Sequence, residues 1–278
     1  MAEIIDGKKL AASIKQSLKE QLSELDKKPF LAVVLVGDDY ASRIYVRNKQ
    51  KACEEVGIGC EIYHLAEDIK SEELKELISG LNDDPDVHGI LVQLPLPEQI
   101  NPMEVISLID VKKDVDGFSP YNAGLLALNS PEAIVPATPK GVLHMLQSTG
   151  ISLVGKHAVV IGRSHIVGRP MAALLLNQDC TVTITHSKTE GLKEICRMAD
   201  IIVSACGQAK MLKKDWVKKG AVVIDVGINR LEEGLCGDAD FEDVSQAAAC
   251  ISPVPGGVGP MTIAMLLDNL YQAYKGQQ

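Results

Sequence analysis

The stretch YVRNKQKACEEVG, residues 45–57, places a lysine on what would be the apolar face of a helix. Lys49 lies in the middle of positions 45, 49, 52, 53 and 56, which share that face. Ser42, Tyr45 and Lys49 are spaced i, i+3 and i+7, so a hydroxyl, a phenol and an amine can converge. Partial burial would lower the lysine pKa and supply a neutral amine that acts as a general base or activates water. The alternative is a lysine whose amine extends into solvent from the edge of the stripe.

Two further polar positions lie in the first half of the chain. Gln93 ends an apolar run in VQLPLP, where Pro95 stops the strand, and ligands in open α/β sheets gather at the carboxyl ends of strands. It could hydrogen-bond Lys49 or a substrate, or simply end the strand. KKDVDGF, residues 112–118, offers Asp114 and Asp116. A carboxylate in a cleft can accept two parallel N–H bonds from a flat, amide-like heterocycle, although Asp-Gly is usually just a turn.

AVVIGRSHIVGRP, residues 158–170, is typical of a strand, a glycine turn and the start of a helix. Gly162 allows a tight turn, and the N–H groups at the helix start could bind a phosphate. The next strand, TVTITH, is followed by Ser187 and Lys188 without a carboxylate, and Arg163 lies in the turn itself. A guanidinium and a hydroxyl without a competing carboxylate suit a 2′-phosphate, so the pattern favours NADP over NAD. A tight turn without a ligand is the alternative. Ser187, Lys188 and Thr189 could also simply cap the next helix, which is compatible with ligand binding.

Strand and helix patterns alternate along the chain and must position these groups. Apolar runs at 30–37, 60–65, 88–93, 157–162, 181–186, 200–205 and 221–228 predict strands, with helices between them. This order predicts parallel βαβ units in two α/β domains with a cleft between them. Prolines interrupt the rhythm between residues 95 and 139. Thr138-Pro139 is typical of an N-cap followed by proline at the first helical position. We expect a first domain over 1–139, completed by the last helix, 262–278, and a Rossmann-like domain over 140–261.

Composition excludes several classes of protein. Of 278 residues, 46% are hydrophobic and 23% charged, which is ordinary for a globular chain. The formal charge of −9 argues against non-specific binding to nucleic acid or an anionic membrane. Seven scattered cysteines without a C-x-x-C pair indicate free thiols in a reducing compartment, and neither a disulfide framework nor a metal site. We also expect no targeting or membrane-spanning segment, hence a cytoplasmic protein.

Taken together, the motifs resemble the bifunctional methylenetetrahydrofolate dehydrogenase/cyclohydrolase family from about Asp6 to Tyr274. They are YVRNKQKACEEVG, VQLPLP, KDVDGF, PATPKG, GRSHIVGRP, DVGIN and PVPGGVGPMT. The resemblance implies oxidation of 5,10-methylenetetrahydrofolate with NADP, hydrolysis to 10-formyltetrahydrofolate, a place in one-carbon metabolism and purine biosynthesis, and a homodimer.

The resemblance also implies roles for individual residues. Lys49 would be the catalytic lysine, Tyr45 would stack on the folate, Gln93 would modulate the lysine, and Asp116 would hold the pterin. The implied cofactor contacts are Gly162, Arg163, Ser164, Ser187 and Ile228.

Two other functions compete with this one. A dehydrogenase without hydrolase activity could share the architecture. A nucleotide-sensing module, in which Lys49 and Asp116 only form surface ion pairs, would bind NADP without turnover. Tyr-x-x-x-Lys also occurs in short-chain dehydrogenases, but there the glycine turn precedes the pair, whereas here it follows.

Overall fold

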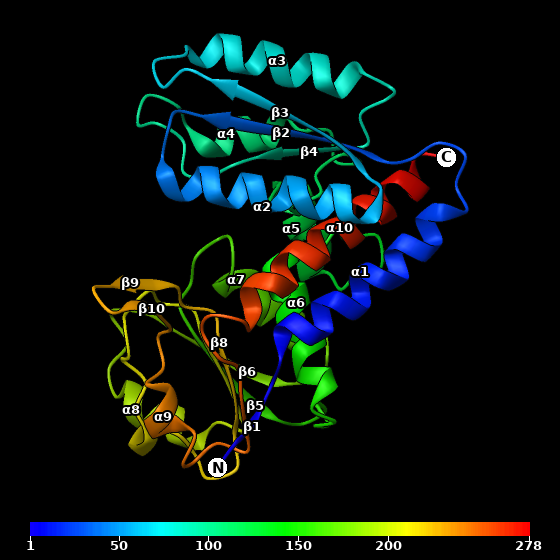
Figure 1. Cartoon of the computed structure of the whole chain (residues 1–278). Coiled ribbons are helices and arrows are strands. Elements are labelled where there is room, and N and C mark those ends of the chain that lie inside the picture. The colour runs from blue at the N-terminus through cyan, green and yellow to red at the C-terminus, as the bar shows by residue number, and fades with distance from the viewer. The chain divides into compact units, whose positions relative to one another are not determined.

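The computed structural model describes all 278 residues, which divide into two compact units. Unit 1 comprises Met1–Ala12, Leu126–Ser130 and Pro136–Thr262, and unit 2 comprises Ser13–Leu125, Pro131–Val135 and Ile263–Gln278. Helices α1 (Gly7–Ser23) and α10 (Val258–Gly276) contribute residues to both units (Figure 1). Each unit contains its own parallel sheet, so the prediction of two α/β units is confirmed. None of the helices combines the length and apolarity needed to cross a membrane.

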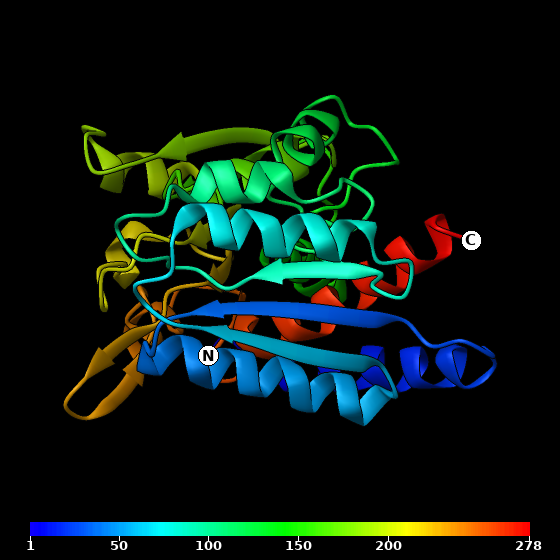
Figure 2. The same ribbon diagram turned by 90° about the horizontal axis from the view of Figure 1, so that it is seen from above.

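Unit 2 is built on three parallel strands, with β2 (Phe30–Val36) between β3 (Gly59–Leu65) and β4 (Gly89–Val92), as Figure 2 shows. Almost every residue of β2 is buried, as expected for a strand covered on both faces. Helices α3 (Ser71–Asp83) and α4 (Pro102–Leu108) pack on one face through apolar side chains. Helix α2 (Tyr40–Val56) lies on the opposite side of the sheet from α3 (Figure 1).

Helix α2 begins five residues earlier than the quoted motif. The Asp39 carboxylate caps it by accepting the Ser42 N–H at 2.7 Å, and Gly57 ends it in the left-handed conformation, φ +85°. The buried stripe therefore runs through Ser42, Val46 and Cys53. Lys49 lies on this stripe, while Tyr45 lies beside it and is 40% exposed.

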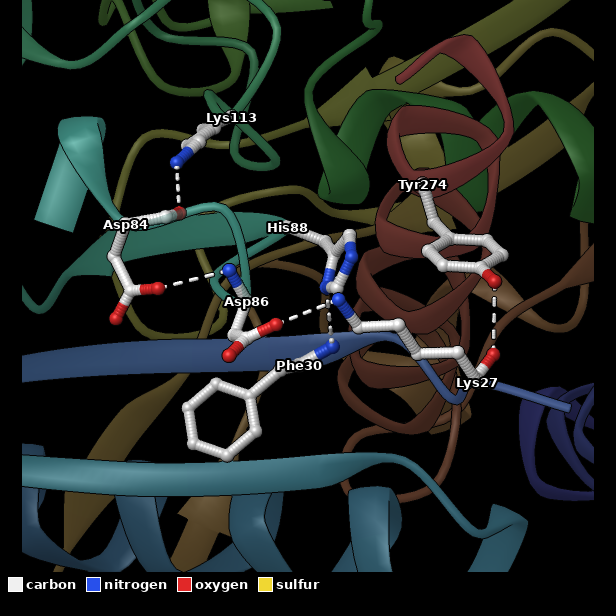
Figure 3. A network of polar contacts seen from close by, with 7 residues as sticks. All are labelled: Lys27, Phe30, Asp84, Asp86, His88, Lys113 and Tyr274. Atoms are coloured by element: carbon white, nitrogen blue, oxygen red, sulfur yellow. Dashed lines mark hydrogen bonds and ion pairs between the residues drawn. The ribbon is translucent and has the colours of Figure 1, made fainter. Parts of the chain in front are cut away.

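The carboxyl-terminal part of α10 packs on the sheet of unit 2 (Figure 3). The Tyr274 hydroxyl donates to the Lys27 carbonyl at 2.8 Å, and its ring meets His88 edge-on with centroids 4.8 Å apart. His88 Nδ1 accepts the Phe30 N–H at 3.1 Å, which joins β4 to the start of β2. Residues far apart in sequence thus hold together the end of the sheet at which β2 and β4 begin.

Unit 1 is built on six parallel strands in the order β1-β11-β8-β7-β5-β6. They are β1 (Glu3–Ile4), β5 (His157–Ile161), β6 (Thr181–Thr185), β7 (Ile201–Ser204), β8 (Val222–Asp225) and β11 (Cys250–Ile251). The strand order reverses at β5, because β6 lies on one side of it and β7 on the other. With right-handed crossovers, α7 (Gly168–Leu176) and α8 (Leu192–Met198) must cover opposite faces. Such a reversal is where nucleotides bind in open α/β sheets.

Other parts of the fold depart from expectation. The proline-rich segment holds α4 and a second short helix, α5 (Pro120–Ala127). Helix α6 (Ala137–Ser148) follows Pro136, so the prediction that Thr138 caps it was wrong. The whole first turn of a helix tolerates proline, because its N–H groups have no intrahelical acceptor, and Pro139 therefore does not fix the start. The 3-10 helix η1 (Lys214–Trp216), helix α9 (Phe241–Val244) and the antiparallel pair β9 (Asn229–Leu231) and β10 (Gly234–Cys236) were not predicted.

Candidate active site

In unit 2 the structure joins the lysine of α2 to the glutamine that follows β4. Lys49 Nζ donates to Gln93 Oε1 at 3.1 Å, and Gln93 Nε2 donates to the Leu94 carbonyl at 2.7 Å. The second bond fixes the orientation of the amide, so its oxygen faces the amine. An amide oxygen accepts a hydrogen bond from a neutral amine as well as from an ammonium, and it adds no charge that would favour protonation.

Burial shifts the protonation of two groups at this site toward their neutral forms. The pKa of Lys49 is lowered by desolvation, and the nearby Asp116 carboxylate opposes this only in part. Desolvation likewise raises the pKa of Asp116 to about 6, with Lys49 opposing and Asp114 adding to the shift. The two side chains do not form an ion pair within 4 Å. If Lys49 lay against a fully ionised Asp116, the pKa of the lysine would be raised instead.

The segment carrying Asp116 is held on both sides. Buried Lys113 donates to the carbonyls of Leu81, Asn82 and Asp84 at 3.0, 2.7 and 2.7 Å, at the end of α3; Figure 3 draws the last of these bonds.

On the other side, Asp114 accepts the Ser119 N–H at 2.9 Å and the Asn122 amide at 2.8 Å. Asn269 of α10 donates to the Val115 carbonyl at 2.9 Å. These contacts leave the Asp116 carboxyl as the one acidic group of the loop that is free of such structural bonds.

The remaining residues of α2 divide between the site and the core. Tyr45 lies one turn before Lys49 and is exposed, with a phenol that makes no hydrogen bond within the chain. It is thus available to stack on a planar ligand. Ser42 is 3% exposed and lies on the buried stripe of α2, on the same face as Lys49.

In unit 1 the expected cofactor residues follow the carboxyl ends of strands in a single sheet. Gly162, Arg163 and Ser164 follow β5, Ser187 follows β6, and Ile228 follows β8. Arg163 and Ser187 are exposed, and Ile228 is 49% exposed. The structure therefore places these five residues along one edge of the sheet, where ligands of such folds bind.

The turn after β5 fits a dinucleotide phosphate. Gly162 has φ +121°, and a Cβ there would overlap the carbonyl oxygen of Ala205, so only glycine allows this approach. Ser164 Oγ accepts the N–H groups of Val167 and Gly168 at 3.1 and 3.4 Å, which holds the turn together from within. The N–H groups of residues 163–166 have no acceptor in the chain and lie in the exposed turn that leads into α7. Free N–H groups at a helix start are the usual ligands of a phosphate.

Ser187, Lys188 and Thr189 do not cap the next helix, a role that would have been compatible with cofactor binding. Thr189 Oγ1 instead accepts the His186 N–H at 2.9 Å and closes a local turn, and α8 starts at Leu192 without a side-chain cap. Ser187 is left with no side-chain partner in the chain, in keeping with a hydroxyl that faces a ligand.

Sequence reasoning missed the groups that support both sites. Lys113, Asn122 and Asn269 hold the Asp116 loop, and Asp225 and Asp238 hold the loops of unit 1. Each is a polar or charged residue that is buried, at 7% exposure or less. The place of Asp225 at the end of an apolar strand could have marked it as a supporting residue. Nothing in the sequence around Asp238 marks it in this way.

Comparison with known proteins agrees with this geometry. The model of the tetrahydrofolate dehydrogenase/cyclohydrolase catalytic domain matches residues 5–116, and that of the NAD(P)-binding domain matches residues 136–278. The bifunctional protein FolD of Listeria innocua is 53% identical, with 99% of this chain and 98% of that protein covered.

Solved structures give the same result. The bifunctional enzyme FolD from Campylobacter jejuni superposes with a TM-score of 0.98 at 51% identity, over the full length of both chains. The Trypanosoma brucei enzyme, solved with NADP cofactor and inhibitor, gives a TM-score of 0.95 at 38% identity, covering 99% of this chain and 98% of that one. With both halves matched in order and at this level of identity, the chain belongs to the tetrahydrofolate dehydrogenase/cyclohydrolase family.

Proposed function

We propose that this chain is an enzyme that oxidises 5,10-methylenetetrahydrofolate with NADP and then hydrolyses the 5,10-methenyl product to 10-formyltetrahydrofolate. Family membership supports both activities. The single observation that carries the hydrolytic half is the Lys49 amine, hydrogen-bonded to Gln93 at 3.1 Å with a lowered pKa.

Oxidation requires positioning more than proton transfer. The methylene carbon lies between two nitrogens of the folate, and their lone pairs stabilise the cation left when it loses a hydride. NADP, when bound, accepts that hydride. The role of the chain is to hold the reacting carbon in place. Tyr45 offers a face for stacking, and the Asp116 carboxyl offers two oxygens to the amide-like edge of the pterin.

Hydrolysis requires proton transfer, and Lys49 is the group for it. Water adds to the cationic methenyl carbon and must lose a proton, and one C–N bond then breaks as its nitrogen gains a proton. A neutral amine takes up and returns that proton, whereas an ammonium would repel the cationic substrate. Gln93 keeps the amine oriented, and the lowered pKa keeps a larger share of it neutral.

NADP would be held by unit 1. The N–H groups of residues 163–166 would meet a phosphate, and Arg163 with Ser187 would recognise the additional 2′-phosphate. Ile228 would contact the cofactor beyond the end of β8. This assignment extends the division expected from the sequence, with folate on residues 1–139 and 262–278 and NADP on residues 140–261.

Two assays on the purified chain test the function. NADPH should form when methylenetetrahydrofolate and NADP are mixed with it, much faster than NADH forms with NAD. Methenyltetrahydrofolate should be hydrolysed without any nucleotide. Oxidation alone would identify a dehydrogenase without hydrolase activity, and NADP binding without either turnover would indicate a nucleotide-sensing module.

We further propose that the enzyme acts as a homodimer in the cytoplasm and supplies formyl groups for purine biosynthesis. These properties rest on the resemblance of the chain to its family. Light scattering coupled to size-exclusion chromatography tests the dimer, since a mass close to that of one chain at micromolar concentration would contradict it.

A further inference from the structure

One buried carboxylate in unit 1 gathers an unusual number of donors. Asp238 is 0% exposed and accepts the N–H groups of Cys206, Gly207 and Gln208 at 2.8, 3.1 and 2.9 Å. It also accepts the Asn229 side-chain amide at 3.0 Å. Successive backbone N–H groups that point at one anion form the concave arrangement that binds phosphates and other anions in many proteins. Here an internal carboxylate occupies it.

A second buried carboxylate interlocks with the first. Asp225, the last residue of β8, accepts the N–H groups of Gly227, Asp238 and Ala239 at 3.0, 2.9 and 2.7 Å. A Cβ on Gly227 would overlap the Asp238 carboxylate, and a Cβ on Gly237 would overlap that of Asp225. The two carboxylates and the two glycines therefore fix each other in a single arrangement.

The segments joined in this way lie at the ends of the central strands. Residues 205–208 follow β7, and the carbonyl of Ala205 contacts the phosphate turn at Gly162. Residues 226–229 follow β8 and include Ile228. The Asp238 carboxylate thus accepts bonds from the first segment and from Asn229 in the second, and the backbone N–H of Asp238 donates to Asp225, which precedes the second segment. It forms no hydrogen bond with Gly162 or Ile228.

We propose that Asp238 is a positioning residue for the dinucleotide: its carboxylate fills the anion-binding concavity after β7 and fixes the loops after β7 and β8 in the shape that receives NADP. Because that concavity is already occupied, the phosphate groups are directed to the turn after β5. The inference rests on the proposed function, since it assumes that NADP is the ligand of unit 1.

Asp238→Asn tests this with minimal change in shape. Either orientation of the amide turns an NH₂ group toward backbone donors that now bond to oxygen, so the loops lose part of their support. We expect the dissociation constant for NADP, measured by calorimetry, to rise about tenfold or more, because buried N–H groups lose their acceptor. Hydrolysis of methenyltetrahydrofolate without nucleotide relies on unit 2 and should change by less than about twofold.

Asp215→Asn is the matched control. Asp215 lies in the same unit on η1, with its side chain 55% exposed in a surface ion pair with Lys193. Its loss should change neither NADP affinity nor hydrolysis by more than about twofold.

Three results would overturn the proposal. The first is an Asp238→Asn variant whose NADP affinity stays within about twofold of the wild type. The second is a wild type that does not bind NADP. The third is a folded variant that loses hydrolysis and NADP affinity equally. If Asp238→Asn does not fold, Asn229→Ala removes one bond to the carboxylate, and we expect NADP to bind about threefold more weakly with hydrolysis unchanged. Unchanged affinity there overturns the inference too. Since calorimetry needs no turnover, a failure of the proposed enzymatic activities remains distinguishable from a failure of this inference.

Discussion

The two candidate sites present their chemistry in different ways. In unit 2 the groups are side chains from α2, from the end of β4 and from the loop that follows α4, and burial shifts the pKa values of Lys49 and Asp116. In unit 1 they are largely backbone N–H groups in the turn before α7, and buried carboxylates hold the loops around them. A side-chain site is sensitive to charge and pH, whereas a backbone site is sensitive to shape. Substitutions should therefore separate the two sites by kind of effect.

Lys49→Gln should produce the largest effect, and that effect should be confined mainly to hydrolysis. We expect hydrolysis to fall by about a hundredfold to ten-thousandfold, because a general base is lost, while oxidation falls by less than about tenfold. Both rates would be measured on one preparation, with Lys51→Gln, an exposed lysine of the same helix, as the control. Equal losses with unchanged folate affinity would contradict a role for the amine in hydrolysis alone.

Gly162→Ala should affect NADP binding, and with it the oxidation. The added methyl group would overlap the Ala205 carbonyl in a backbone conformation that disfavours alanine, φ +121°. We expect NADP to bind about a hundredfold more weakly, with hydrolysis preserved. Gly80→Ala is the control, since nothing lies within 4 Å of its Cβ position. If hydrolysis fell in parallel with NADP binding, the shape of the turn would not be specific to the cofactor.

The same contrast explains how much the sequence could predict. Helix and strand positions follow from local periodicity, so the two parallel sheets and the helix bearing Lys49 were foreseen. The contact of Lys49 with Gln93 could be anticipated because both follow strands of one sheet. The hydrogen bonds of Asp238 could not be anticipated, because its partners lie about thirty residues earlier and nothing in the local sequence marks it as buried. The burial of Ser42 was also not foreseen.

Asp116→Asn should have a moderate effect on stability, with a defined sign. The pKa of Asp116 is raised to about 6 by burial. Its ionisation therefore destabilises the native chain once the pH rises above the pKa of an ordinary carboxyl group. The stability that the protonated form provides is complete below about pH 4 and is lost as the pH rises through about 6. At pH 7.5 we expect the variant to gain about 1–2 kcal/mol relative to the wild type, after allowing for partial exposure.

Urea denaturation of both proteins at a series of pH values measures this difference. Asp114→Asn is an informative counterpart, because Asp114 is 1% exposed and its carboxylate carries structural bonds. That variant should be less stable than the wild type at pH 7.5. A difference between Asp116→Asn and the wild type that does not vary between pH 4 and 7.5 would show that the carboxyl of Asp116 is not desolvated.

His88 should give the smallest effect, with the opposite dependence on pH. Its pKa is lowered by burial and by the cations Lys27 and Lys113, against the smaller influence of Asp86 and Asp84. The neutral ring accepts the Phe30 N–H, and protonation would remove that acceptor. Stability is thus complete above about pH 6.5 and falls as the pH drops, because the unfolded chain binds a proton that the native chain resists.

His88→Asn retains an oxygen acceptor near the Nδ1 position but does not titrate. The variant should be less stable than the wild type at pH 7.5, because the ring contact with Tyr274 is lost. Between pH 7.5 and 5 we expect that deficit to shrink by about 0.5–1 kcal/mol, since only the wild type loses stability through this ring. A deficit that stays constant would mean that His88 titrates alike in the folded and unfolded chains. The pH dependence of unit 2 would then arise from its site and not from the attachment of α10 to the sheet.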